Sequence, residues 1–168
     1  AWRQILISNK PAALLLSRQN LPVFNRSEYG AAEGVVRGAY TLYEPASTPN
    51  GIIIATGSEV AIALAAAKLA SAEGLYLRVV SAPCLEWFYE QSEEYRQSVL
   101  PKEISVRVSV EAGIAMGWRE LVGDHGSILS LEHFGASASG PELFKEFGFT
   151  AENVLTHVKK SIASVKGK

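Results

Sequence analysis

Hydrophobic and polar positions along the chain form two alternating patterns, short apolar runs and longer stretches with helical spacing. The clearest apolar run, Gly51–Gly57, is rich in β-branched residues, which is typical of a strand buried on both faces. An Ala-rich stretch follows to about Glu73, and Gly74 is placed to end it as a helix. Ser58 stands where an N-cap is expected and Glu59 in the first helical turn.

The same alternation continues to the C-terminus. Further strands are predicted at residues 35–43, 75–81, 104–110 and 127–131, and helices at 85–100, 117–121, 141–147 and from Thr150 onward. Strands that alternate with helices indicate an α/β three-layer sandwich, with a mainly parallel sheet of about five strands and helices on both faces. Ligands bind such sheets beyond the carboxyl ends of the strands, here the loops at Gly57–Ser58, Ala82–Pro83, Glu111–Gly113 and Glu132–Ser137.

The first thirty residues do not follow this alternation. Residues 1–9 have helical spacing that Pro11 ends, and the continuous apolar run Ala12–Leu16 predicts a short buried strand. Residues 22–33 have no clear period and are predicted to be a linker. We therefore expect a domain boundary there.

Composition narrows the class of protein. The chain has 168 residues, 48% of them hydrophobic, and a net charge of −1, which fits a domain with a sizeable core and gives no basic excess for nucleic-acid binding. No apolar stretch is long enough to span a bilayer. A single cysteine, Cys84, cannot form an internal disulfide, so we expect a reducing, cytoplasmic location. The opening residue Ala1, with neither Met nor a signal peptide, suggests derivation from a longer chain.

Few residues are candidates for chemistry. The Gly57–Ser58 turn could hold a phosphate at a helix N-terminus, although a tight turn is the simpler interpretation. Glu111 is a lone carboxylate at a strand end and could be an acid, a ligand or a contact residue. His125, His133 and His157 lack metal-ligand spacing, and Cys84 has no neighbouring base in sequence. We therefore predict no catalytic, cofactor-binding or metal-binding residue.

Arg18 is the exception, because it lies in the polar cluster Ser17–Asn20 directly after an apolar run. Its planar guanidinium can donate bidentate hydrogen bonds to a phosphate or a carboxylate. The residues alone leave two interpretations open, an anion anchor and a structural salt bridge.

The string LSRQNLP at residues 16–22 resembles the transketolase signature near the end of the pyrimidine-binding domain. Further similarities to transketolases continue in family order over nearly all of the chain, at Ala55–Val60, Arg78–Ser81 with Pro83-Cys84, Val110–Gly113 with Gly117-Trp118, Phe134–Ala138, and Phe147–Thr150 with Asn153-Val154. Dihydroxyacetone synthase has the same architecture, but this ordered set favours transketolase.

The resemblance implies a homodimeric enzyme of the pentose phosphate pathway, with three α/β domains per chain. It would move a two-carbon ketol unit between sugar phosphates, using thiamine diphosphate and Mg²⁺ or Ca²⁺. Residues 1–22 would end the thiamine-pyrimidine-binding domain, 23–34 would be a linker and 35–168 the C-terminal domain. Arg18 would bind the substrate phosphate. The family's cofactor, metal and catalytic residues belong to upstream sequence, so none is expected here.

The role of the chain by itself stays open between three interpretations. It could be catalytically inactive and contribute structure and dimer contacts, with the aromatic residues at 87–95 as candidates for the interface. It could be a regulatory module that binds a small molecule near Gly57–Ser58 and Glu111. It could also be one subunit of a split enzyme.

Overall fold

The computed structural model describes residues 1–167. Its centre is a five-stranded sheet in the order β1-β3-β2-β4-β5. β1 is antiparallel to β3, and the other neighbouring pairs are parallel. The strands are β1 Tyr40–Tyr43, β2 Gly51–Ala55, β3 Leu77–Ser81, β4 Arg107–Val110 and β5 Ser127–Leu129. The predicted fold class, a mainly parallel sheet of about five strands, is confirmed.

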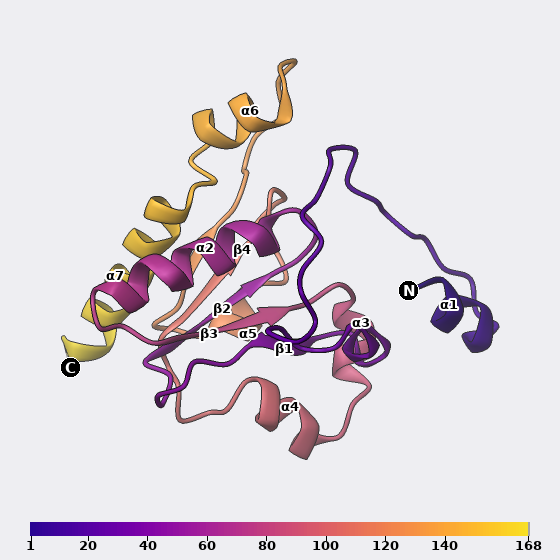
Figure 1. Ribbon diagram of the computed structural model, residues 1–168, viewed down its shortest axis with the longest axis horizontal. Coiled ribbons are helices and arrows are strands. Elements are labelled where there is room, and N and C mark those ends of the chain that lie inside the picture. Colours follow the sequence, from indigo (N-terminus) through magenta and orange to yellow (C-terminus); the bar gives the residue numbers. More distant parts are fainter. Residues whose placement is uncertain (168) are drawn as a thin grey trace.

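Helices cover both faces of this sheet. The long helices α2 and α7 lie together on one face, and the short helices α3, α4 and α5 lie on the other side (Figure 1). The helices are α1 Trp2–Ser8, the 3-10 helix η1 Ala32–Arg37, α2 Glu59–Ala72, α3 Leu85–Tyr89, α4 Glu93–Val99, α5 Arg119–Val122, α6 Gly140–Glu146 and α7 Ala151–Lys166. None of the described helices is both long enough and apolar enough to cross a membrane.

Alternate side chains of the central strands supply the two halves of the core. Ile53 of β2 packs with the α2 and α7 side, whereas its neighbours Ile52 and Ile54 pack with Phe88 and Trp118 on the other side. All three isoleucines are at most 1% exposed. A parallel strand covered by helices on both faces has no solvent side, which explains why β2 is a continuous apolar run.

The strand order reverses between β2 and β4. From β2 the chain proceeds to β3 on one side, and from β4 it proceeds to β5 on the other. The helices that follow therefore diverge to opposite sides, and the carboxyl ends of β2 and β4 lie side by side at this switch point. Open α/β sheets bind ligands at such points.

The predicted strand at Ala12–Leu16 is wrong. These residues are extended but pair with no strand among the described residues, and the side chains of Leu15 and Leu16 are 88% and 76% exposed. An apolar run becomes a strand only where a partner supplies hydrogen bonds, because a single strand leaves its backbone groups unpaired. The interpretation of this run as buried finds no support within residues 1–167.

Two smaller predictions also need correction. The predicted strand at 35–43 is divided into η1 and β1, with a break at Gly38, where the backbone has φ +82°. Ser58 occupies the N-cap position of α2 but makes no capping hydrogen bond, since its Oγ donates to Glu59 Oε2 instead. Thr150 does cap α7 as predicted, with its Oγ1 accepting from the Asn153 N–H.

Candidate functional site at the carboxyl edge of the sheet

The segment Ser17–Asn20 reaches the carboxyl edge of the sheet at the switch point. A Cβ placed on Gly57, in the turn after β2, would lie 3.6 Å from Ser17 Oγ, and one on Gly140 would lie 4.0 Å from Gln19 Cβ. Gly57 has φ +56°, a left-handed conformation that costs glycine little. The structure therefore brings together two stretches that sequence analysis singled out separately, the Arg18 cluster and the Gly57–Ser58 turn.

Arg18 itself is exposed at this edge. Among residues 1–167, its guanidinium makes no hydrogen bond or ion pair, so the structural salt bridge has no partner in the described chain. Its five N–H donors are available to an anion. The anion-anchor interpretation of Arg18 stays a prediction.

Glu59 and Glu111 form a carboxylate pair beneath this segment. Glu59 is 4% exposed, and its two oxygens accept hydrogen bonds from Ser58 Oγ at 2.9 Å and from the Ala112 N–H at 3.1 Å. Glu59 thereby ties the start of α2 to the loop after β4. Glu111 stands next to this contact, and its buried Oε2 has no hydrogen-bond partner within the described residues.

This environment changes the acidity of Glu111. Burial, and after it the negative charge of Glu59, raises the pKa of Glu111 to about 7. Both causes disfavour the ionised form. The sequence showed Glu111 as a carboxylate without a partner, because Glu59 is brought beside it by the parallel pairing of β2 with β4 and by the Glu59–Ala112 hydrogen bond.

The loops after β4 and β5 complete the edge. The Gly113 carbonyl accepts from the Leu131 N–H at 2.8 Å, and Glu132 Oε1 accepts from the Ala115 N–H at 2.8 Å, so the two loops are held together. Three large apolar side chains on them point to solvent: Ile114 at 53%, Met116 at 82% and Phe134 at 98% exposed. We call these three residues the loop patch.

The aromatic residues at 87–95 are mainly core residues. Phe88 is 2% exposed, and the partly buried Tyr89 and Tyr95 pack against the same core cluster. Tyr95 also donates a hydrogen bond to the Ala39 carbonyl at 2.9 Å. The interface role of residues 87–95 stays a prediction, and the side chains of the loop patch are more exposed than Phe88.

The histidines and the cysteine occupy separate places. His125 lies near Ser164, His157 contacts Ser127, and His133 packs edge-on against Phe147 with ring centroids 5.0 Å apart. Within residues 1–167 no three His, Cys, Asp or Glu side chains are grouped to hold a metal ion.

Cys84 is half-buried, and burial raises the pKa of its thiol. This disfavours the thiolate at neutral pH, as expected for a structural cysteine rather than a nucleophile.

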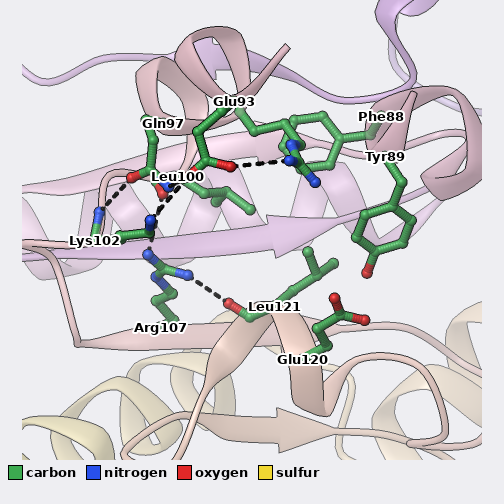
Figure 2. Close-up of a pocket in the computed structure, with 10 residues that line it drawn as sticks. Phe88, Tyr89, Glu93, Gln97, Leu100, Lys102, Arg107, Glu120 and Leu121 are labelled. Atoms are coloured by element: carbon green, nitrogen blue, oxygen red, sulfur yellow. Dashed lines mark hydrogen bonds and ion pairs between the residues drawn. The ribbon is translucent and has the colours of Figure 1, made fainter. Parts of the chain in front are cut away.

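A cavity of about 400 Å³ lies between α3, α4 and α5, away from this edge (Figure 2). The charged groups that line it contact neighbouring segments. Arg107 donates to the carbonyls of Ile104, Leu121, Leu100 and Pro101. Glu93 forms ion pairs with Arg96 and Lys102. Four carbonyl acceptors satisfy the half-buried guanidinium without a carboxylate. No residue singled out from the sequence as a site candidate lines this cavity.

Comparison with known proteins agrees with the fold. The chain is an α/β domain with helices on both faces of a mainly parallel sheet, and residues 38–150 match the family described as Transketolase-like TK C-terminal domain. The chain therefore belongs to the transketolase family. It is 48% identical over 170 aligned residues to the transketolase of Mycobacterium tuberculosis and 47% identical over 159 to that of Aquifex aeolicus.

Those alignments cover 96% and 94% of this chain but only 24% and 23% of the relatives, so the chain spans about a quarter of their length. Among solved structures, a Pichia stipitis transketolase in complex with sedoheptulose 7-phosphate superposes with a TM-score of 0.80 at 40% identity. That match covers 90% of this chain and 21% of the yeast one. The resemblance drawn from the sequence is confirmed.

Proposed function

We propose that this chain is the C-terminal part of a transketolase that moves a two-carbon ketol unit between sugar phosphates in the pentose phosphate pathway of the cytoplasm. The domain match and the identity to named transketolases support this assignment. The similar Pichia stipitis enzyme is described as a complex with a sugar phosphate.

The observation that carries the proposal is the position of Arg18. Its exposed guanidinium has no partner in the described chain, and Ser17 beside it lies against the Gly57 turn at the switch point. We assign Arg18 to the phosphate end of the substrate, away from the reacting carbon. Binding energy gained at such a remote group supports orientation at the reacting centre.

The chain's own residues do not fit the cofactor. A divalent ion with a diphosphate needs grouped oxygen ligands, and residues 1–167 contain no group of three or more metal-ligating side chains. Thiamine diphosphate, which stabilises a carbanion when bound, would be held with its Mg²⁺ or Ca²⁺ by the three-quarters of the relatives' length that this chain does not span. We derive no chemical step from the residues present.

Partners of the chain follow from its exposed apolar side chains. We assign residues 1–22 to the end of the pyrimidine-binding domain and 23–34 to a linker. Six large apolar side chains within the first 23 residues are 62–98% exposed: Trp2, Leu6, Ile7, Leu15, Leu16 and Val23. Their exposure supports contact with the remainder of a longer chain. The loop patch supports a second contact, with that remainder or with the second subunit of a homodimer.

Substitution of Arg18 tests the substrate role. In a transketolase that carries this sequence as its C-terminal part, Arg18→Ala is expected to lower kcat/KM for xylulose 5-phosphate and ribose 5-phosphate roughly 10- to 100-fold, because charge-assisted hydrogen bonds to the phosphate are lost. Transfer from hydroxypyruvate to glycolaldehyde, which carry no phosphate, should change little. Arg26→Ala is the control, since Arg26 donates to the Gly30 carbonyl instead.

Equal losses with phosphorylated and unphosphorylated substrates would refute the phosphate role while leaving the family assignment intact. A separate assay tests the assignment of the missing parts. The 168-residue chain, supplied with thiamine diphosphate and Mg²⁺, is expected to give no ketol transfer, whereas turnover free of contaminating enzyme would place the chemistry within residues 23–168.

A further inference from the structure

A second concave surface lies on the outer side of β5, and Arg18 is not among its lining residues. β5 pairs only with β4 within the described chain, so its other edge has no neighbouring strand. Beside this edge, residues of β5, α7, the start of α5, the loop between α5 and β5 and the loops after β4 and β5 line a space of about 450 Å³. We call this space the β5-edge groove. Its volume lies within the range of small-molecule sites, roughly 300–1,000 Å³.

Polar side chains in the groove are held in place by one another. Ser127 is 7% exposed, and its Oγ lies 2.7 Å from His157 Nδ1. His125 Nδ1 lies 3.0 Å from Ser164 Oγ, and the buried Ser161 donates to the His125 carbonyl at 2.7 Å. Both imidazoles are thus oriented through one nitrogen, which leaves the other nitrogen of each ring available to a ligand.

The two cationic side chains of the groove are not in ion pairs with other described residues. Within residues 1–167, neither Lys160 nor Arg119 makes an ion pair, whereas the adjacent Lys159 pairs with Glu73 at 2.7 Å. Glu132 lines the groove, but its carboxylate accepts from the Ala115 N–H and from Ser130.

One exposed carboxylate, Asp124, remains at the rim. The lining thus holds two cations, Lys160 and Arg119, and two carboxylates, Asp124 and Glu132, and neither cation is in an ion pair within residues 1–167. Burial, and after it the charge of Lys160, lowers the pKa of His157, so the groove disfavours a further positive charge. An anion near Lys160 would pair with its free charge and oppose this lowering of the His157 pKa.

We propose that the β5-edge groove binds a small phosphate ester, with its phosphate between Lys160 and Arg119 and its hydroxyl groups against the serines and imidazoles. Lysine and arginine together supply a point charge and a planar fork for phosphate. The serine hydroxyls and imidazole nitrogens both donate and accept, as the hydroxyls of a sugar require. The groove shares Ala115 and Glu132 with the loops that complete the Arg18 edge, but Arg18 does not line it, and its occupation does not depend on the proposed substrate role of Arg18.

Titration of the isotopically labelled 168-residue chain tests this site by NMR, with inorganic phosphate and ribose 5-phosphate as separate probes. Saturable shifts of the His157 and His125 ring signals are expected, together with an upward shift of the His157 titration midpoint. Lys160→Ala should weaken binding roughly 5- to 10-fold through loss of a charged hydrogen bond. Lys159→Ala is the matched control, since it removes the same charge one position away in α7.

Each outcome decides part of the proposal. Tighter binding of ribose 5-phosphate than of inorganic phosphate supports an ester, whereas equal affinities support the phosphate contact and overturn the contribution of the sugar. Absence of saturable shifts in the tens of millimolar range would overturn the site. So would an equal loss of affinity in the Lys159 and Lys160 variants, because binding would then follow net charge alone.

Discussion

The first 23 residues and the α/β body, which is the sheet with its covering helices, both contain a continuous apolar run. Only the run in the body is buried. Ala12–Leu16 and β2 are both continuous and apolar, yet Leu15 is 88% exposed whereas Ile53 is fully buried. The difference lies in the neighbours: β2 is paired on both edges and covered by helices, and the N-terminal run is not paired in the described chain. An apolar run shows that residues require burial, but not which polypeptide buries them.

Core truncation gives the largest expected contrast between the two regions. Ile53→Ala should lower the free energy of unfolding by about 2–5 kcal/mol, through lost apolar transfer and the cavity left behind. Leu16→Ala, at a position 76% exposed, should change it by less than about 0.5 kcal/mol. Denaturant titration of both variants of this chain measures the two values. A comparable loss for Leu16 would mean that the N-terminal segment is packed.

Glu111 provides the next contrast, because it lies in the body directly beneath the N-terminal segment. Its pKa is raised to about 7 in the folded state from an ordinary value near 4.5, so the folded chain binds one proton more than the unfolded chain between these values. Stability from this group is therefore fully present below about pH 4.5 and is lost as the pH rises through about 7. Glu111→Gln should remove this loss and stabilise the chain at pH 8 by about 1–3 kcal/mol.

Denaturant titrations at pH 5 and pH 8 measure the effect of Glu111→Gln. Glu59→Gln separates the two causes of the pKa shift: burial is the larger one, so removal of the Glu59 charge should move the Glu111 midpoint only part of the way down. The midpoint is read from the side-chain carboxyl signal by NMR. An equal change in stability between pH 5 and pH 8 in the parent chain and in Glu111→Gln would contradict the inferred burial of the Glu111 carboxyl.

The body was the predictable part of the fold because its signals are local. Gly51–Ala55 is a strand, Gly74 follows the end of α2, and Thr150 caps α7, all as the sequence indicated. These signals act over a few residues. The division of residues 35–43 into η1 and β1 was missed, since β1 is an edge strand of only four residues whose pairing with β3 includes a register shift.

The candidate site was predictable residue by residue but not as an assembly. Arg18, the Gly57–Ser58 turn and Glu111 were each recognised, because their positions after apolar runs are visible in sequence. Their proximity was not, since it depends on the order β3-β2-β4 and on the path of residues 17–19 over the edge. The sequence indicates which residues follow each strand. The strand order decides which of these strand ends lie next to one another.

Removal of residues 1–23 is expected to have only a small effect on the stability of the chain. Contacts of this segment with the body that would be lost include an exposed Lys10–Glu90 ion pair at 3.9 Å and the approach of Ser17 to Gly57, so the free energy of unfolding should change by less than about 1 kcal/mol. Phe24 and Tyr29 pack against the core and must stay. Their removal, in a chain that begins after Gly30, should lower the free energy of unfolding distinctly more and serves as the control.

Solubility should improve when only residues 1–23 are removed, because the six exposed apolar side chains are gone, and static light scattering measures it. A large loss of stability on removal of residues 1–23 alone would place that segment within the body rather than in a partner domain.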